Sequence, residues 1–357
     1  MTTLDAVRDE TDAATGDWLQ TVLDATLERS LAHAPASVDA DRLGGALREA
    51  TAGGKRFRPR LVALVHAGLG GTEHRGLAPV AAAVELLHTA LVVHDDVIDG
   101  DDTRRGRRSV PGRFRAEATE AGATPRGADA YALAGAVLTG DLALTAAVRT
   151  IATAPLPTAV VHRLLDLVDS ALVVSATGEL ADVRLAAGLG RPTPAEALAM
   201  AGNKTAAYSF ELPMKAGAVL AGAPAATVEG VGRVGRLLGT AFQLRDDLLG
   251  VFGDPEVTGK SDLADLREGK CTPLVVHAQG TAAWAPVAAH WGDPGITPGQ
   301  AAAVRQALRE AGSETYVEEL AARLTARASV HASTLGLPPG IVDRVEDLCR
   351  LPRRGAA

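Results

Sequence analysis

The feature that most constrains the fold is a helical repeat of apolar residues along almost the whole chain. Apolar residues return every three or four positions, which is the spacing of one helix face, and strand-like alternation is scarce. We therefore predict an all-α fold of about eleven helices. The predicted helices cover residues 15–30, 38–50, 57–70, 75–98, 128–151, 157–186, 195–220, 226–250, 298–311, 314–335 and 340–350.

Composition supports this prediction. The chain has 357 residues, of which 47% are hydrophobic and only 3% aromatic, so its core must be built from small aliphatic side chains. Such a core suits closely packed helices better than a sheet sandwich. We find no repeat of fixed period and no low-complexity linker. We therefore predict a single domain over residues 1–357, to which the C-terminal helices at 298–350 also belong.

The charge balance excludes some classes of partner. Lys and Arg total 36 against 43 Asp and Glu, giving a net charge of −7, which argues against binding nucleic acid or anionic membrane over the whole surface. Cys271 and Cys349 are far apart and lack CxxC spacing, which indicates neither a disulfide framework nor a zinc site. Residues 1–20 lack a signal-peptide core, and no uninterrupted apolar run approaches about 18 residues. We expect a cytoplasmic protein without a membrane span.

Two aspartates one helical turn apart end the apolar helix predicted at 75–98. Asp95 and Asp99 share a face with His88 and Val92. The two carboxylates repel each other, and the helix dipole at a C-terminus already favours cations. A hard divalent cation such as Mg²⁺, which takes carboxylate oxygens, resolves this conflict. The alternative is a solvated acidic helix end paired with nearby arginines.

A second aspartate pair ends the helix predicted at 226–250. Gln243 precedes Asp246 and Asp247 by three and four residues, so an amide and two carboxylates lie on one side of the helix. Long polar segments, 101–112 and 253–271, follow the first and second pairs, and long loops in compact domains tend to be functional. Two such arrangements are unlikely to occur by chance, so we predict two acidic sites that bind metal.

Cationic residues lie beside both aspartate pairs. The segment GGKRFRPR at 53–60 places four cations at a predicted helix start, where unpaired N–H groups favour an anion. The segment 102–108 supplies guanidinium groups that suit phosphate oxygens, and Lys204, Lys260 and Lys270 follow. Each cation alone is best interpreted as a solvated surface charge. Together with the carboxylates, they predict a site where metal ions hold one diphosphate and Arg and Lys hold another.

Five motifs carry a resemblance to a known family. They are GGKRFRP at 53–59, ELLHTALVVHDDVID at 85–99, DDTRRG at 101–106, GNKTA at 202–206 and FQLRDDLLGVFGDPEVTGK at 242–260. In these motifs and their order, the chain resembles the trans-prenyl diphosphate synthases over residues 40–275, and most of all the bacterial geranylgeranyl diphosphate synthases.

The resemblance implies a fold, a reaction and a set of metal ligands. The fold is the class I isoprenoid synthase bundle around a deep central cavity, usually as a homodimer, with the aspartate motifs facing each other across the cavity mouth. The reaction is Mg²⁺-dependent, head-to-tail condensation of isopentenyl diphosphate with dimethylallyl, geranyl or farnesyl diphosphate. The resemblance implies about three Mg²⁺ ions, held by Asp95, Asp99 and Asp246, with Asp96 and Asp247 as supporting carboxylates.

It also implies which residues bind each substrate. Isopentenyl diphosphate would be bound by Lys55, Arg58, His88 and Arg105. The allylic diphosphate would be bound by Arg104, Lys204, Thr205, Gln243, Lys260 and Lys270, with Lys204 acting in catalysis beside the aspartates.

Three departures from the family pattern stand out. Gly250 occupies a position where many members have a third aspartate, which removes a metal ligand or its support. Glu179, followed by Asp182, occupies a position where many members have Gln. Pro111 and Gly112 follow the arginine-rich segment, and the sequence gives no interpretation of them.

The resemblance also predicts product length. A growing tail would run along the helix before Asp95, past Leu91, Ala90 and Leu87. In the family, a bulky aromatic residue five positions before the first aspartate tends to end growth at C15, and here that position is Ala90. We therefore expect geranylgeranyl diphosphate (C20) as the main product, with C15 or longer chains as alternatives.

Two other functions remain open. A class I terpene cyclase would share the fold and metals but would need no second diphosphate site, so Lys55, Arg58 and Arg105 count against it. A non-catalytic partner subunit would not need either aspartate pair. Both pairs are present here, which counts against this alternative.

Overall fold

The structure is a computed structural model that describes residues 19–72, 75–104, 106–253 and 264–349. Within these ranges the chain is helical almost throughout. One short antiparallel hairpin joins β1 (Thr103–Arg104) to β2 (Arg107–Arg108). The predicted all-α fold is confirmed.

The helices begin and end as follows. Residues 19–31 are helical, and after them come α2 (Val38–Thr51), α3 (Phe57–Gly68), α4 (Leu77–Ile98), α5 (Val110–Glu120), α6 (Pro125–Ala152), α7 (Thr158–Ala186), α8 (Pro194–Ala201), the π-helix η1 (Gly202–Glu211), α9 (Leu212–Leu220), α10 (Ala225–Phe252), α12 (Ala264–Glu268), α13 (Pro273–Gln279), α14 (Trp284–Ala288), α15 (Pro298–Glu310), α16 (Ser313–Thr334) and α17 (Ile341–Leu348).

Several elements differ from the prediction. The helix expected at 195–220 is three consecutive elements, α8, η1 and α9. Helix α5 was not predicted, although Ser109 caps its N-terminus and Pro111 lies in its first turn, which are recognised start signals. Helices α12, α13 and α14 were also missed, because five to seven residues are too few to show a helical period.

The chain forms two compact units that are not consecutive in sequence. Unit 1 contains Met1–Val168 and Lys215–Pro224, and unit 2 contains Asp169–Met214 and Ala225–Ala357. Helices α7 and α9 each have residues in both units. The single domain over residues 1–357 stays a prediction.

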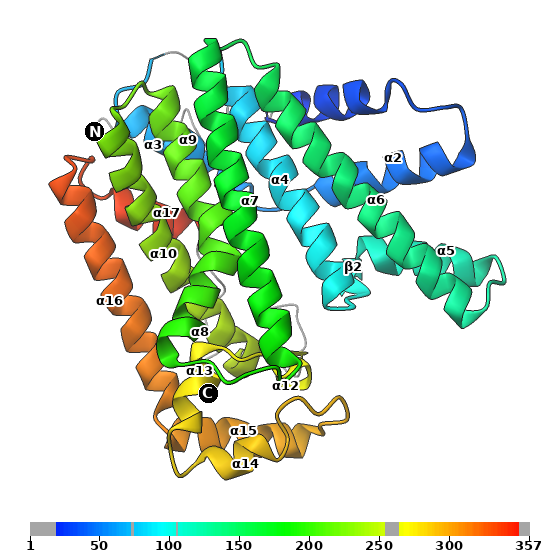
Figure 1. Ribbon diagram of the computed structural model, residues 1–357, viewed down its shortest axis with the longest axis vertical. Coiled ribbons are helices and arrows are strands. Elements are labelled where there is room, and N and C mark those ends of the chain that lie inside the picture. The colour runs from blue at the N-terminus through cyan, green and yellow to red at the C-terminus, as the bar shows by residue number, and fades with distance from the viewer. Residues whose placement is uncertain (1–18, 73–74, 105, 254–263, 350–357) are drawn as a thin grey trace. The chain divides into compact units, whose positions relative to one another are not determined.

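Unit 1 is built around α4. This helix packs against α6, and α5 in turn packs along α6, as Figure 1 shows. Their shared core contains Val93, Phe114 and Ala136. A Cβ atom on Gly135 of α6 would lie 2.5 Å from the Phe114 ring, so glycine is what allows the close approach. This packing fixes the end of α4 that carries the first aspartates.

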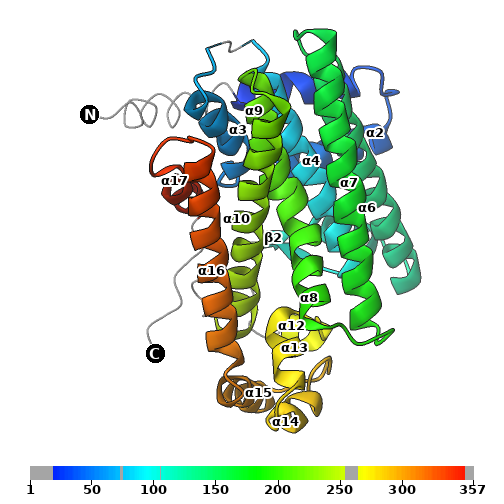
Figure 2. The same cartoon turned by 60° about the vertical axis from the view of Figure 1, so that its left-hand side comes forward.

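Unit 2 is built around α10. This helix packs against α16, which Figure 1 shows beside it, and also against η1. A Cβ atom on Gly239 of α10 would lie 2.6 Å from the Cβ of Ala206 in η1, so small residues set this distance. Helices α13, α14 and α15 gather at one end of α16 (Figure 2). The core between these helices contains Leu244, Leu248 and Leu308.

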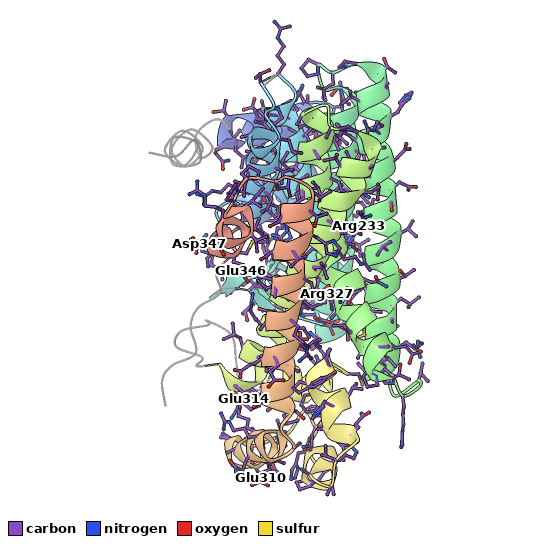
Figure 3. All side chains as sticks on the ribbon, turned by 90° about the vertical axis from the view of Figure 1, so that its left-hand side faces the viewer. Arg233, Glu310, Glu314, Arg327, Glu346 and Asp347 are labelled. Atoms are coloured by element: carbon purple, nitrogen blue, oxygen red, sulfur yellow. The ribbon has the colours of Figure 1, made fainter. Side chains whose placement is uncertain are left out.

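Helix α17 is joined to α10 and α16 by a polar network. Arg245 of α10 donates to Glu346 of α17 at 2.8 Å and to Thr325 of α16 at 3.2 Å. The Thr325 hydroxyl also donates to Glu346 at 3.1 Å. Figure 3 shows Glu346 and Asp347 on α17 beside α16. The C-terminal helix is therefore connected to the helix that carries the second aspartates.

Two helices, α4 and α6, are long and apolar enough to cross a membrane by length and composition alone. The apolar window of α4 is 61% buried, as in the core helix of a soluble fold, and that of α6 is 44% buried. The absence of a membrane span stays a prediction.

Candidate functional site

The first aspartate cluster lies at the C-terminal end of α4. Asp99 follows the last residue of the helix, and its N–H donates to the Asp95 carbonyl at 2.8 Å. Asp95 and Asp99 each offer a carboxylate oxygen, and the two atoms lie within 4.8 Å of each other. Hard oxygen donors at this separation fit a divalent cation such as Mg²⁺.

Arg104 of β1 bonds two carboxylates of this cluster. Its Nη2 donates to Asp95 at 2.9 Å and its Nε to Asp96 at 2.5 Å. Burial raises the pKa of Asp96 to about 6, although the Arg104 charge opposes the shift. The carboxylates in turn raise the pKa of Arg104, although burial opposes that shift. Arg104 therefore stays cationic beside the predicted metal ligands, and Arg105 lies outside the described residues.

The segment after the hairpin explains Gly112, while Pro111 lies in the first turn of α5. The Ser109 hydroxyl donates to the Asp101 carbonyl at 2.5 Å and accepts from the Gly112 N–H at 3.1 Å. A Cβ atom on Gly112 would overlap the Asp102 carbonyl oxygen. Gly112 is thus required where the first turn of α5 meets the loop before the hairpin.

The cationic segment 53–60 forms the turn from α2 into α3. Lys55 is exposed, whereas Arg58 is buried with its guanidinium 4.3 Å above the Phe57 ring. Arg56 instead donates to Glu85 of α4 at 2.8 Å. Arg56 is thus bonded within the fold, and it is not among the residues predicted to bind substrate. His88, three residues after Glu85 on α4, is half-buried.

The second aspartate cluster lies near the end of α10. Gln243 donates to Asp247 at 2.7 Å and accepts from the Thr205 hydroxyl of η1 at 2.5 Å. Burial is the main cause that raises the pKa of Asp247 to about 8. The predicted residues Thr205, Gln243 and Asp247 therefore form one hydrogen-bonded chain, with Asp246 half-buried beside them.

Lys204 of η1 lies between two carboxylates of α7. Its Nζ donates to Glu179 at 3.0 Å and to Asp182 at 2.9 Å. The sequence singled out both acids only as a departure from the family pattern. A Cβ atom on Gly178 would overlap the Lys204 backbone nitrogen, so α7 also contacts the backbone of η1. Short π-helical segments are frequent at functional sites.

The side-chain carboxylate of another acidic residue lies against Gly250. A Cβ atom there would overlap the Asp265 carboxylate of α12, with the Asp265 Cγ at 2.7 Å. An aspartate side chain at position 250 has no room in this arrangement. Lys270 forms an ion pair with Glu268 at 2.6 Å, and Lys260 lies outside the described residues.

Sequence reasoning missed the contacts of Glu85 and Asp265. Glu85 carried a signal, because a charged residue inside an apolar helix must have a partner if it is buried. Asp265 carried none, since its contact depends on how the short helix α12 packs against α10.

These features define a class of protein. An all-α fold with aspartate pairs near the ends of two long helices, α4 and α10, is that of the class I isoprenoid synthases. Residues 41–286 match the family model described as polyprenyl synthetase, and the chain belongs to that family.

Relatives and solved structures agree with this assignment. A geranylfarnesyl diphosphate synthase of Aeropyrum pernix is 37% identical over 247 residues, which are 68% of this chain and 72% of that protein. A geranylgeranyl diphosphate synthase of Mycobacterium tuberculosis is 37% identical over 225 residues, which are 63% of this chain but 58% of that protein. With several other curated relatives, too, the match spans less than two thirds of the relative's length.

The structural matches cover more of the chain. The geranylgeranyl pyrophosphate synthase of Corynebacterium glutamicum, solved with isoprenyl diphosphate and magnesium, has a TM-score of 0.85 and 28% identity, with 96% of this chain and 97% of that chain covered. A polyprenyl synthase of Caulobacter crescentus, solved with calcium and isoprenyl diphosphate, has a TM-score of 0.74 and 25% identity, with 97% and 96% covered. The relatives and structural neighbours are prenyl diphosphate synthases, which are transferases.

Proposed function

We propose that this chain joins isopentenyl diphosphate head to tail to an allylic diphosphate, with geranylgeranyl diphosphate as the main product. The observation that carries the proposal is a cationic segment at the start of α3, which is distant in sequence from both aspartate clusters. Lys55 precedes α3 and Arg58 lies in its first turn, Arg104 is bonded to Asp95 of the first cluster, and Lys204 is bonded to Glu179 and Asp182 of α7. Two sets of cations suit two diphosphate substrates, which a synthase needs and a cyclase does not.

Each set of residues has its own task in this proposal. Asp95 and Asp99 of α4 and Asp246 of α10 would hold Mg²⁺, about three ions in all, and the positive charge of the metal would stabilise the departing diphosphate. Arg104, Lys204 and Lys270 hold the allylic diphosphate, and Lys55, Arg58 and His88 hold isopentenyl diphosphate. Apolar side chains around the tail exclude water, so the alkene attacks the allylic carbon instead. The released diphosphate takes the final proton.

The product length follows from the apolar residues of α4. Leu87 and Ala90 are each 1% exposed, and Leu91 is half-buried. Each added isoprene unit buries five carbons, worth on the order of 4 kcal/mol, so only a steric stop ends growth. Ala90 leaves room for a tail longer than C15. The names of several relatives also support a C20 product.

A product assay tests the proposed function. The purified chain is incubated with Mg²⁺, labelled isopentenyl diphosphate and the C5, C10 or C15 allylic diphosphate, and the dephosphorylated products are sized. We expect a C20 alcohol as the main product. A hydrocarbon formed without isopentenyl diphosphate would identify a cyclase, and no product from any primer would favour a non-catalytic subunit.

We also propose that the chain is a homodimer in which a second copy covers α6. Leu133 and Leu138 are 53% and 50% exposed, and Val137 and Val148 are each 37% exposed. Their spacing places them along one side of the helix, where Asp141 is the only charged residue between 133 and 148. An apolar face of this kind marks an interaction site.

Sedimentation tests the dimer. The double variant Leu133→Glu with Leu138→Glu should be monomeric, while Val330→Glu, at an exposed valine of α16, should stay dimeric. A monomeric wild-type chain, or a double variant that remains dimeric, would contradict this proposal.

A further inference from the structure

Arg56 has an unusual backbone conformation. Its φ of 51° makes it the one non-glycine residue with positive φ in the part of the chain that the structure describes. A side chain in the left-handed region is strained, and such strain persists only where surrounding contacts hold it. Gly53 and Gly54 also have positive φ, of 75° and 83°, so the turn into α3 is tight.

The Arg56 side chain connects three elements. Its Nη1 donates to Glu85 of α4 at 2.8 Å, and its Nη2 donates to the Thr51 carbonyl, in the last residue of α2, at 2.5 Å. Carbonyls in the last turn of a helix lack partners within the helix, so this bond caps α2. The same Nη2 lies 3.4 Å from the Gln20 side-chain oxygen. These bonds hold Arg56 at the N-terminus of α3.

Glu85 depends on this arginine. The side chains of Arg56 and Glu85 are only 15% and 7% exposed. Arg56 is the one charged partner of the Glu85 carboxylate among the described residues, and the buried Oε2 atom has no hydrogen-bond partner. Without Arg56, an uncompensated charge would remain buried beside the turn.

The position of the pair links it to isopentenyl diphosphate. Arg56 lies between Lys55 and Arg58, and Glu85 lies three residues before His88 on α4. All three neighbours belong to the set proposed above to bind this substrate. The ion pair thus joins the two elements that carry these residues, α3 with its preceding turn and α4.

We infer that Arg56 and Glu85 are positioning residues for isopentenyl diphosphate, which hold Lys55 and Arg58 against the face of α4 that carries His88. The inference rests on the proposed function, because it assumes that these residues bind that substrate. The pair does not touch the substrate. Its effect is to fix the turn, so that substrate binding need not order it.

The test separates binding of one substrate from turnover. Arg56→Gln removes the charge, Arg56→Lys keeps the charge but loses the two-armed contact, and Glu85→Gln removes the charged partner of the arginine. The matched control is Arg113→Gln, which breaks an arginine–glutamate pair of 2.7 Å with Glu49 elsewhere in unit 1. Calorimetry measures isopentenyl diphosphate binding without allylic substrate, and kinetics give both Michaelis constants.

We expect Arg56→Gln and Glu85→Gln to weaken isopentenyl diphosphate binding by about tenfold or more, because small displacements of positioned groups are costly. Arg56→Lys should recover part of this loss. The Michaelis constant for the allylic substrate, and kcat at saturating isopentenyl diphosphate, should change by less than about twofold. Arg113→Gln should leave all three quantities unchanged.

The outcomes are distinguishable. If the wild-type chain does not bind isopentenyl diphosphate, the proposed function fails and this inference fails with it. If the wild type binds but folded variants bind equally well, or if both Michaelis constants rise together, only the inference is wrong. Should Glu85→Gln fail to fold, Arg56→Lys decides the question alone, because an unchanged affinity in that variant contradicts the inference.

Discussion

Charged side chains of the candidate site are bonded to one another. Arg104 bonds Asp95 and Asp96, and Lys204 bonds Glu179 and Asp182. Such pairing fixes each cation in place and offsets the repulsion between neighbouring carboxylates. In the proposed function these carboxylates would bind a divalent cation and the held Arg and Lys would bind a diphosphate.

The predicted metal ligands give the most direct test at the scale of single residues. Asp95→Ala or Asp246→Ala should lower turnover roughly a hundredfold or more, because each removes a carboxylate from the charges that stabilise the leaving group. Both residues are half-buried near helix ends, so circular dichroism should show an unchanged fold.

The control is Asp129→Ala, which removes an exposed aspartate of α6 far from both clusters in sequence. Turnover of this variant should match the wild type. Near-normal turnover of either Asp95→Ala or Asp246→Ala would mean that the metal ions are bound elsewhere.

Sequence motifs named candidate site residues but not the partners of those residues. Thr205 and Gln243 were predicted to act together, and the structure places them in contact at 2.5 Å. Lys204 and Glu179 are 25 residues apart in sequence, and Arg56 and Glu85 are 29 residues apart. Such contacts depend on helix packing, which periodicity within one helix does not specify.

At the scale of elements, the π-helix η1 is the main departure from the predicted helices. It carries Lys204 and Thr205, and α10 approaches it closely at Gly235 and Gly239. Residues 195–220 have a continuous helical pattern, so the sequence predicted one helix. Because π-helical segments are rare, a helical pattern is interpreted as an α-helix, and the sequence has no separate signal for the ten residues of η1.

Gly178 of α7 tests how η1 is held. Gly178→Ala would place its Cβ against the backbone of Lys204 and 2.8 Å from the Asn203 carbonyl carbon, and a backbone cannot rotate away as a side chain can. We expect the variant to lose about 1–3 kcal/mol of stability, as for other overpacked sites. The Michaelis constant for the allylic substrate should rise as Lys204 is displaced.

Thermal denaturation and steady-state kinetics measure these two effects. Gly188→Ala is an unsuitable control because its φ of 73° would itself add strain. Gly299→Ala is suitable, since a Cβ there meets no atom within 4 Å. A Gly178→Ala variant as stable and active as Gly299→Ala would show that η1 can shift without cost.

Helix α4 provides the test of product length. Ala90→Phe would place a ring in the path proposed for the growing tail, five residues before Asp95. We expect the main product to shift from C20 to C15, while the affinity for isopentenyl diphosphate stays nearly unchanged. If the folded variant still makes the wild-type product, another helix must supply the steric stop.

At the scale of the whole molecule, the helical class was predictable but the division into units was not. The apolar repeat predicts helices wherever it occurs, and most of the long helices lie where it placed them. Two of the three unit boundaries fall inside α7 and α9, where the sequence has no break in pattern, and the third falls in the turn between α9 and α10. Which residues belong to which unit depends on contacts between segments that are distant in sequence.

Two buried aspartates should make the stability of the metal-free protein depend on pH. Burial raises the pKa of Asp247 from 3.8 to about 8 and that of Asp96 from 3.8 to about 6. Between the unfolded and folded pKa values the folded chain binds more protons than the unfolded chain, so rising pH favours unfolding. The contribution of each carboxyl to the stability of the fold is complete below about pH 4. It is lost as pH rises through the pKa of that carboxyl in the folded chain.

Asp247→Asn and Asp96→Asn remove these titrations one at a time, and each serves as a control for the other. With EDTA present, the melting temperature of Asp247→Asn relative to wild type should rise steadily from pH 4 to about pH 8 and then level off. For Asp96→Asn the relative melting temperature should level off near pH 6. Any constant offset, such as a weakened contact with Arg104, does not change where the curve levels off. Relative melting temperatures independent of pH in both variants would mean that these carboxyls titrate as they do in the unfolded chain, and that burial does not control their charge.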